Sequence, residues 1–362
     1  MTASRPLRVL HVDPERGWGG GEVQLMGLVR ELAERGHHST VAAHPDGPLA
    51  RACATAGVSV VPLPIANHFD LRAGLALRHR ARGADVVHFH TARAHALAPL
   101  CRGVGARLVV TRRMDYVPAG GPYVRFLYNR AVDRVIAISE GVRAALLRVG
   151  VQAERMRIVP SGVDAEAMMA PPAARGARRR EWGLGEEHVA VVVVGALERR
   201  KGHAVLLASA RRLAPAGLGL RYVFCGEGRE ADALERAAAA LDGAVRFVGF
   251  RADVPVCLAA ADVVALPSLQ EGLGVAALEA MAAGRAVVAS RVGGLAEVVV
   301  HEETGLLVPP ADPEALALAL ARLAREPALR TRLGAAGRAR ALAHYSMSRM
   351  AAGTLACYEE RP

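Results

Sequence analysis

The chain has 362 residues, of which 52% are hydrophobic and 22% charged, so it can build two apolar cores and is not a disordered, collagen-like or low-complexity protein. Its formal net charge is +11, and 45 of its 46 basic residues are arginine, which leaves Lys201 as the single lysine. The charge is uneven, because residues 1–180 carry +12 and residues 181–362 carry −1. This asymmetry predicts an anionic partner for the first half, such as a phosphorylated glycolipid, a membrane surface or a nucleic acid.

Five scattered cysteines form no Cys-x-x-Cys pattern, which predicts reduced thiols, a cytoplasmic location and no structural zinc. The chain runs from Met1 directly into a strand-like segment at 8–12. Its longest apolar runs are far shorter than the roughly 20 residues that span a membrane. We therefore expect no signal peptide and no membrane span, with only peripheral contact at the inner face of the plasma membrane.

Runs rich in valine and isoleucine alternate with helical stretches in the first half, a pattern typical of parallel α/β folds. Strands are predicted at 7–12, 38–43, 57–63, 85–89, 107–111, 134–138 and 156–159. Helices are predicted at about 22–35, 48–56, 71–82, 94–103, 122–131 and 140–149. Residues 160–180 have three prolines and little periodicity, which predicts a linker.

A glycine-rich loop follows the first strand, where Gly19, Gly20 and Gly21 precede a helix that starts near Glu22. Glycines at such a turn let the backbone approach a phosphate, and the helix N-terminus offers free N–H groups. An ordinary glycine-rich turn is an equal alternative, because neither G-x-G-x-x-G nor a P-loop spacing is present.

A basic and aromatic segment lies between residues 112 and 134. It predicts contact with an anionic acceptor or lipid headgroups through Arg112, Arg113, Tyr123, Arg125 and Phe126. An ordinary helix, with its aromatic residues in the core and its arginines in water, is an equal alternative. The basic run at 78–82 is interpreted as a solvated helix end.

The second half repeats the α/β pattern. Strands are predicted at 189–195, 220–226, 245–250, 262–268, 286–290 and 305–309, with helices near 202–213, 229–240, 253–260 and 274–283. This predicts a second doubly wound sheet. Two such domains place a ligand cleft between the carboxyl ends of both sheets.

Three cations, Arg199, Arg200 and Lys201, follow the strand at 189–195. They are suited to neutralise a pyrophosphate, although a solvated basic loop is the alternative. The retention of Lys201 in a chain that otherwise uses arginine favours a function.

The most informative stretch is residues 267–299, with Glu271 in a loop and Glu279 on the helix that follows. Carboxylates eight residues apart are about two helical turns apart, so both can face one groove. The helix N-terminus also offers a phosphate the N–H groups of Leu273, Gly274 and Val275. For either glutamate alone, a solvated face or a cap is the alternative.

The sequence Glu271-Gly-Leu-Gly-x₄-Glu279-Ala-Met-Ala-x-Gly, followed by Val-Gly-Gly-x-x-Glu297 and Thr304-Gly-Leu-Leu-Val, resembles the retaining enzymes of glycosyltransferase family 4 and their E-x₇-E motif. Further matches occur in the same order: GGGE with RGH (35–37), VVH (86–88), VIAIS (135–139), VPSGVD (159–164) and G-x-L-x-x-x-KG (195–202). The resemblance spans nearly the whole chain and extends to bacterial lipopolysaccharide and glycolipid glycosyltransferases.

The resemblance implies the GT-B fold, in which two Rossmann-like doubly wound domains face each other across a cleft. It implies an acceptor-side domain at 1–172, a donor-binding domain at 173–345, and a last helix at 346–362 that returns to the first domain. Glu271 would hydrogen-bond the donor sugar and Glu279 the ribose. The diphosphate would be bound by Arg200, Lys201 and the N–H groups of Leu273, Gly274 and Val275, with Gly19 and Gly20 closing the phosphate side. No cofactor and no metal are implied, because these cations and the helix dipole replace Mg²⁺.

Two positions depart from the family pattern. Ala196 stands where many relatives carry arginine, which leaves Arg199 or Arg200 to supply the charge. Many relatives also have a T-x-H stretch after the fifth strand, where this chain reads TRRMDY at 111–116. Besides Glu271, the catalytic candidates are therefore Asp115 and His90, with Arg112 as another replacement. A core or surface histidine is an equal alternative for His90.

The sequence thus predicts a cytoplasmic, membrane-peripheral retaining glycosyltransferase. It would move a sugar from a nucleotide-diphosphate donor to an anionic glycolipid or lipopolysaccharide-type acceptor of the cell envelope. The alternatives are a GT-B enzyme of another type (a nucleotide-sugar epimerase, a phosphorylase or a soluble glycoside synthase) and a non-catalytic binder of anionic surfaces. Nucleic acid is disfavoured as a partner, because no helix-turn-helix, RRM or zinc motif is visible.

Overall fold

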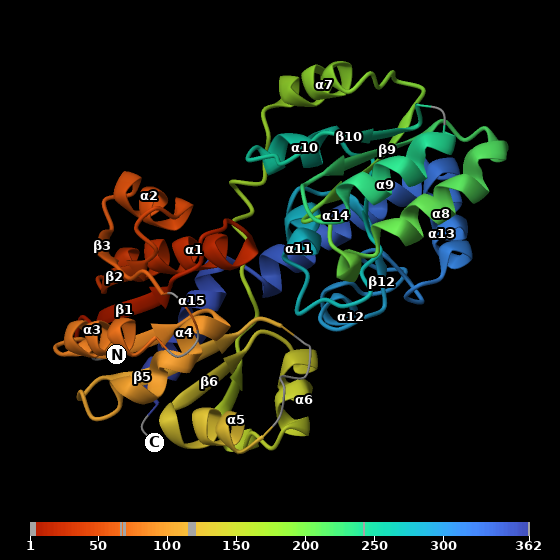
Figure 1. The fold of residues 1–362 in the computed structure, drawn as a ribbon. Coiled ribbons are helices and arrows are strands. Elements are labelled where there is room, and N and C mark those ends of the chain that lie inside the picture. The colour runs from red at the N-terminus through yellow and green to blue at the C-terminus, as the bar shows by residue number, and fades with distance from the viewer. Residues whose placement is uncertain (1–4, 66, 68–69, 115–120, 242, 361–362) are drawn as a thin grey trace. The chain divides into compact units, whose positions relative to one another are not determined.

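The computed structural model describes residues 5–65, 67, 70–114, 121–241 and 243–360. The chain forms two compact units (Figure 1). Unit 1 comprises Met1–Gly162 together with Met347–Pro362, and unit 2 comprises Val163–Ser346. The chain thus divides after Gly162 and again before Met347, whereas the boundary expected from the sequence follows residue 172.

Unit 1 is built on a seven-stranded sheet with the strand order β3-β2-β1-β4-β5-β6-β7, in which all pairings are parallel. Its strands are β1 (Arg8–Asp13), β2 (His38–Ala43), β3 (Ser59–Pro62), β4 (Val86–Phe89), β5 (Arg107–Arg112), β6 (Arg134–Ala137) and β7 (Met156–Ile158). Its helices are α1 (Gly20–Glu34), α2 (Pro48–Thr55), α3 (Leu71–Ala81), α4 (Ala92–Leu97), α5 (Pro122–Phe126), α6 (Glu140–Arg148) and α15 (Met347–Glu359). The order reverses between β1 and β4, which is where ligands bind in open α/β sheets.

The core of unit 1 forms where α1 and α15 pack on the central strands. Leu28 and Leu32 of α1 are 3% and 0% exposed and meet Val86, Val109 and Ile136 of the sheet. On α15, the same cluster includes Met350, Ala351 and Tyr358. The apolar stripe of α1 therefore fixes the position of its glycine-rich N-terminus at the carboxyl edge of the sheet.

Unit 2 repeats the architecture with a six-stranded parallel sheet of order β10-β9-β8-β11-β12-β13. Its strands are β8 (Val189–Val194), β9 (Leu220–Cys225), β10 (Val245–Phe247), β11 (Val263–Leu266), β12 (Ala286–Ser290) and β13 (Leu306–Val308). Its helices are α7 (Pro172–Glu181), α8 (His203–Leu213), α9 (Ala231–Ala238), α10 (Val254–Ala260), α11 (Val275–Ala282), α12 (Leu295–Val298), α13 (Pro313–Arg325) and α14 (Pro327–His344). The prediction of two doubly wound α/β sheets is confirmed.

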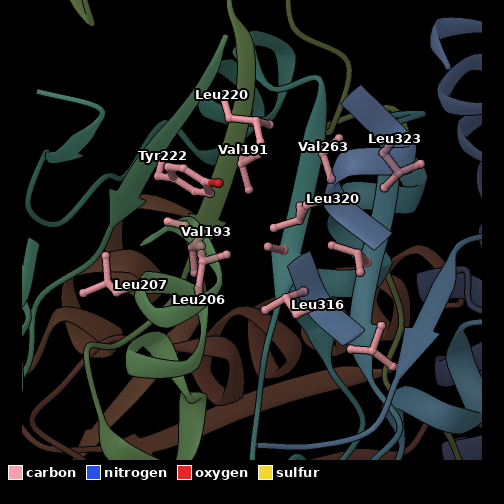
Figure 2. Packing of buried hydrophobic residues seen from close by; sticks show 14 of the residues in the cluster. Val191, Val193, Leu206, Leu207, Leu220, Tyr222, Val263, Leu316, Leu320 and Leu323 are labelled. Carbon is pink, nitrogen blue, oxygen red and sulfur yellow. The ribbon is translucent and has the colours of Figure 1, made fainter. Parts of the chain in front are cut away.

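Figure 2 shows the core of unit 2, where β-branched residues of the central strands meet leucines of the covering helices. Val191 and Val263 are both 0% exposed, and Leu206 of α8 and Leu320 of α13 pack in the same cluster. Valine suits a strand that is covered on both faces, and leucine suits a helix. This packing leaves the loops at the carboxyl ends of β8 and β11 as the places for polar chemistry.

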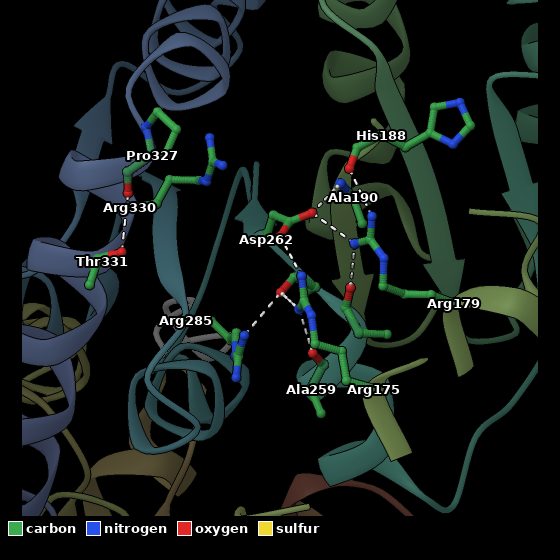
Figure 3. Close-up of polar contacts among 12 residues, drawn as sticks. Arg175, Arg179, His188, Ala190, Ala259, Asp262, Arg285, Pro327, Arg330 and Thr331 are labelled. Carbon is green, nitrogen blue, oxygen red and sulfur yellow. Dashed lines mark hydrogen bonds and ion pairs between the residues drawn. The ribbon is translucent and has the colours of Figure 1, made fainter. Parts of the chain in front are cut away.

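The predicted linker at 160–180 is wrong in its later part, because α7 begins at Pro172. Pro172 suits a first helical turn, where its missing N–H is not needed. Arg175 and Arg179 both reach Asp262, with nitrogen–oxygen distances of 2.7 and 2.9 Å (Figure 3). Ion pairs rather than an apolar stripe hold this helix, so its sequence lacks the periodicity on which the prediction depended.

Candidate active site

In unit 2, two loops at neighbouring strand ends are joined by backbone hydrogen bonds. One loop follows β8 and contains Arg199–Lys201 in a 3₁₀ turn, and the other follows β11 and contains Glu271. The N–H groups of Leu269 and Gln270 donate to the Arg200 carbonyl at 2.7 and 3.2 Å. The loops are therefore fixed against each other, although they are far apart in the sequence.

Glycine is required at Gly202, where the two loops approach most closely. Its φ is +66°, and a Cβ atom there would lie 1.9 Å from the Pro267 carbonyl oxygen. Before it, Gly195 lies at the end of β8, and the Cε atom of Lys201 passes 4.0 Å from where a Gly195 Cβ would stand. In the KG pair of the motif, Lys201 thus supplies the cation, and Gly202 forms the tight turn that positions it.

Lys201 and Glu271 form a partly buried ion pair. The ammonium contacts Glu271 Oε2, and the two side chains are only 16% and 11% exposed. Ser268 Oγ donates to the same carboxylate oxygen at 3.5 Å. Charges removed from water interact strongly with any further charge brought beside them.

Glu279 supplies a second carboxyl group on α11. Burial raises the pKa of Glu279 to about 7, and the Lys201 charge partly offsets that rise. Lys201 therefore acts on both glutamates of the E-x₇-E motif. Arg200 does not join them, because its Nε donates to Glu198 Oε2 at 2.8 Å and its side chain is 30% exposed.

The N-terminus of α11 lies beside Glu271. Gly274 caps the helix with a φ of +95°, and a Cβ atom there would lie 2.4 Å from a Leu295 methyl carbon. The first N–H to bond back into the helix is that of Ala277, which donates to the Gly274 carbonyl at 2.9 Å. The N–H groups of residues 273–276 thus lie outside the helical ladder, at the positive end of the helix dipole.

In unit 1, Gly19 and Gly20 lie at the N-terminus of α1 and are exposed. The Gly19 N–H donates to Glu22 Oε2 at 2.7 Å, which is the half of a capping box that needs no side chain at the N-cap. Arg113 passes this turn, with its Cδ atom 3.9 Å from where a Gly21 Cβ would stand.

A ladder of polar side chains crosses the sheet of unit 1 near its carboxyl edge. Alternate residues of β1, β4 and β5, or of the loops just after them, contribute His11 and Asp13, His88 and His90, and Thr111 and Arg113. His90 Nε2 lies 3.1 Å from His11 Nδ1, and Arg113 Nη2 lies 3.5 Å from His90 Nδ1. Because a guanidinium only donates, His90 Nδ1 must accept, and His90 Nε2–H donates to His11.

This ladder places His90 away from solvent and in a fixed tautomer. Burial holds the pKa of His90 well below its ordinary value, with His88, His11 and Arg113 contributing in the same direction. His90 is therefore neutral, and both of its ring nitrogens face hydrogen-bond partners. We do not assign it the role of a base.

Among the described residues, His11, His88 and His90 are the one group whose spacing suits a metal ion, with nitrogen atoms within 4.8 Å of one another. The chemistry of this group does not fit a cation. Both His88 nitrogens are hydrogen-bonded at 2.7 Å, to the hydroxyl groups of Tyr358 and Thr111. The Arg113 guanidinium also lies beside His90 and would repel a second positive charge.

Sequence reasoning missed Asp13, which is 1% exposed. Burial and the Glu22 carboxylate raise the pKa of Asp13 to about 7. Its Oδ2 atom is buried without a hydrogen-bond partner among the described residues. The signal was the polar alternation HVD, HFH and TRR in strands of a parallel sheet, where both faces are normally apolar.

The five residues predicted to contact an acceptor or lipid headgroups, at 112–126 within the segment 112–134, do not all lie on the surface. Arg112 ends β5 and is 5% exposed, so it does not offer its side chain to a lipid surface. Tyr123, Arg125 and Phe126 of α5 are exposed, and Asp115 lies outside the described residues. The helix expected at 122–131 changes to a π-helical turn at Leu127–Ala131, which buries Leu127 and Tyr128. No helix in the described part of the chain is long and apolar enough to cross a bilayer.

Replacing Glu279 by glutamine is expected to stabilise the protein increasingly as the pH rises from 5 to 8. The folded-state pKa of about 7 lies above the ordinary 4.5, so the folded protein holds this proton more tightly than the unfolded chain and loses stability across that range. At a pH well above 7, the ionised Glu279 is expected to lower the free energy of unfolding by on the order of 3 kcal/mol. Urea unfolding of wild type and variant at pH 5 and pH 8 measures it, with Glu235→Gln on the exposed face of α9 as the control. A pH-independent difference for Glu279→Gln contradicts the shift.

Comparisons with known proteins cover both units. Residues 175–340 match the family model described as glycosyl transferases group 1, and residues 18–167 match the model of glycosyltransferase family 4. Alpha-maltose-1-phosphate synthase of Mycolicibacterium smegmatis is 32% identical over 96% of this chain and 97% of that protein. From the same organism, GDP-mannose-dependent alpha-(1-6)-phosphatidylinositol monomannoside mannosyltransferase is 31% identical over 67% of each chain. The crystal structure of Anabaena Alr3699/HepE in complex with UDP and glucose matches with a TM-score of 0.86 and 23% identity, covering 97% of this chain and 100% of that one, which confirms the GT-B fold.

Proposed function

The chain belongs to glycosyltransferase family 4, and on that premise we propose that it transfers a sugar, with retention, from a nucleoside diphosphate donor to a phosphate-bearing acceptor of the glycolipid or cell-envelope class. The observation that carries the proposal is the partly buried Lys201–Glu271 pair at the N-terminus of α11. The Lys201 ammonium and the N–H groups of residues 273–276 converge there on a place suited to a diphosphate.

In this mechanism Lys201 and the N–H groups of residues 273–276 stabilise the negative charge that develops on the leaving diphosphate. Glu271 holds Lys201 in place and accepts from the hydroxyl groups of the donor sugar, while Glu279 accepts from the ribose. The acceptor attacks from the face that the diphosphate leaves, and a phosphate oxygen takes its proton. With these groups in place, the transfer needs no metal ion and no nucleophilic side chain.

The charge of the first half supports an acceptor that carries phosphate. Residues 1–180 hold a net charge of +12, whereas the half with the proposed donor site is nearly neutral. The names of the two relatives described above, a maltose-1-phosphate synthase and a phosphatidylinositol monomannoside mannosyltransferase, both include a phosphate. A free sugar phosphate and a phospholipid headgroup share this chemistry.

We place the contact with the membrane on α3 rather than on the segment at 112–126. The outer face of α3 exposes Leu71 by 64% and Leu75 by 62%. Exposed arginines accompany these leucines at positions 72, 80 and 82. Apolar side chains among cations suit the surface of an anionic bilayer, and the one adjacent carboxylate, Asp70, accepts from the Ala73 N–H as the cap of the helix.

The test is a transfer assay with UDP-glucose and GDP-mannose as donors, in which nucleotide release and product mass are measured. Glucose 1-phosphate, inositol 3-phosphate and phosphatidylinositol vesicles are the acceptors, and glucose and inositol are their unphosphorylated controls. We expect transfer only to phosphorylated acceptors. Equal transfer to glucose or inositol, or no transfer with any donor, overturns the proposal.

A Leu71→Ser/Leu75→Ser variant in the same assay separates the two sources of phosphate. We expect it to lose transfer to vesicles and to keep transfer to soluble phosphates. Leu318→Ser serves as the matched control, because Leu318 is 67% exposed in unit 2. Unchanged vesicle activity in the double variant removes α3 as the docking face.

A further inference from the structure

The chain passes between the two units at two places, from Gly162 to Val163 and from Ser346 to Met347. Inside unit 2, Val163 and Ser346 form a β-bridge, and the Val163 N–H donates to the Tyr345 carbonyl at 2.7 Å. The two crossing segments therefore lie side by side where they enter unit 2. Any motion of one unit against the other must pass through these segments.

On the side of unit 1, the first crossing is held by the side chain of Gln24 in α1. The Gln24 amide donates to the Gly162 carbonyl at 2.8 Å, and the Gly162 N–H donates to Gln24 Oε1 at 2.8 Å. Gln24 is 1% exposed, so no water competes for these bonds. A buried amide that satisfies both backbone groups of one residue holds that residue in a single orientation.

The second crossing is anchored on the same helix. Gly27 of α1 allows the start of α15 to approach, because a Cβ atom there would lie 2.6 Å from Met347 Sδ. Arg35, just past the end of α1, donates to Ser348 Oγ at 2.7 Å. Gly162 also meets α15, since its N–H lies 3.3 Å from Met350 Sδ. Helix α1 is thus the part of unit 1 on which both crossings rest.

Helix α1 also begins at the glycine-rich turn with Gly19 and Gly20. Gln24 lies in its second turn, close to that end. The geometry points to Gln24 as a positioning residue, which locks the first crossing to α1 and thereby limits how the two units move against each other during turnover. This inference rests on the proposed function.

The alternative is that Gln24 only stabilises the fold, and Asn129 in the same unit provides the comparison. Its amide donates to the Gly150 carbonyl at 2.9 Å, and its Oδ1 accepts from the Gln152 N–H at 2.9 Å. This clamp has the same two bonds and is buried as well, but it holds a loop remote from both crossings. Asn129→Leu and Gln24→Met each remove an amide and keep its approximate volume.

The experiment combines kinetics with a distance measurement in the full chain. Spin labels at Thr55→Cys and Arg212→Cys, both exposed, report the separation of the units, and the five native cysteines are buried. We expect both variants to lose thermal stability. Only Gln24→Met is expected to broaden the distance distribution without nucleotide and to lower kcat about tenfold, with the donor KM and the UDP Kd within about twofold of wild type. Gln24→Glu, which keeps the acceptor for the Gly162 N–H, is expected to fall in between.

Equal losses of kcat in Gln24→Met and Asn129→Leu overturn the inference, as does an unchanged distance distribution in Gln24→Met. The distance measurement without nucleotide does not depend on turnover. If the wild-type enzyme fails to transfer any sugar, the proposed function fails, while the broadening in Gln24→Met still decides whether the clamp orders the crossing.

Discussion

Replacing Lys201 by alanine is expected to lower the rate of sugar transfer by about 10³-fold while the chain remains folded. Lys201 is the cation of a partly buried pair, and its charge acts on Glu279 as well as on Glu271. Without it, the leaving diphosphate loses a charged donor, typically worth about 3 kcal/mol in a dry site, and meets an uncompensated Glu271 carboxylate. The value of kcat/KM for the nucleotide sugar measures the loss, and the thermal shift that UDP induces should disappear.

Matched variants separate the role of Lys201 from a general loss of charge. Arg212→Ala removes an exposed cation near the far end of α8 and should leave transfer unchanged. Lys201→Arg keeps the charge but replaces the compact ammonium group by a larger, planar guanidinium group. Only a small part of the activity should therefore return. The double variant Lys201→Ala/Glu271→Ala should cost little more than either single change, because the two residues act as one unit. Activity of Lys201→Ala within tenfold of wild type contradicts the assignment.

The part of the site in unit 2 was predictable because its residues follow a fixed spacing at strand ends. Lys201 and Glu271 are 70 residues apart, yet each follows a valine-rich strand, and those strands are neighbours in a doubly wound sheet. Of the two E-x₇-E glutamates, Glu271 in the loop contacts Lys201, and Glu279 on the helix is close enough for the Lys201 charge to offset part of the rise that burial causes in its pKa. Local pattern and topology agree here, which is why the proximity of Lys201 and Glu271 could be predicted from the sequence.

The remaining features were not predictable because their partners carry no periodic signal. Helix α7 is held by Arg175 and Arg179 on a distant aspartate, so it has no apolar stripe. The bond from Gln24 to Gly162 joins a side chain to a backbone 138 residues away, and no residue pattern specifies such a contact. In the TRR stretch, successive side chains alternate between the two faces of the sheet, so Arg112 and Arg113 lie on opposite faces. A prediction based on the number of charges in the segment does not take this alternation into account.

Asp262 holds unit 2 together at the sheet edge opposite the site. Its Oδ2 accepts from the Ala190 N–H at 2.8 Å, and its N–H donates to the Ala190 carbonyl at 2.9 Å, which joins the starts of β8 and β11. The Arg175 and Arg179 guanidiniums also donate hydrogen bonds to the Asp262 carboxylate (Figure 3). Burial raises the pKa of Asp262, but the Ala190 N–H and the two arginines outweigh burial and hold this pKa below its ordinary value. Its stabilising effect is therefore complete above pH 3.8 and is lost as the pH falls through the lower folded-state pKa.

Replacing Asp262 by alanine is accordingly expected to destabilise the protein by about 3 kcal/mol, because it leaves the buried Arg179 and the partly exposed Arg175 without this counter-charge. Urea unfolding measures the loss. Glu326→Ala, which breaks the exposed Arg322–Glu326 pair, should cost less than about 1 kcal/mol. Lys201 and Glu271 lie at the other ends of these strands, so the value of kcat per folded Asp262→Ala molecule should remain near that of wild type. A small change in stability contradicts the role of Asp262 as the anchor of α7, and a large fall in kcat in fully folded protein contradicts the separation of the two sheet edges.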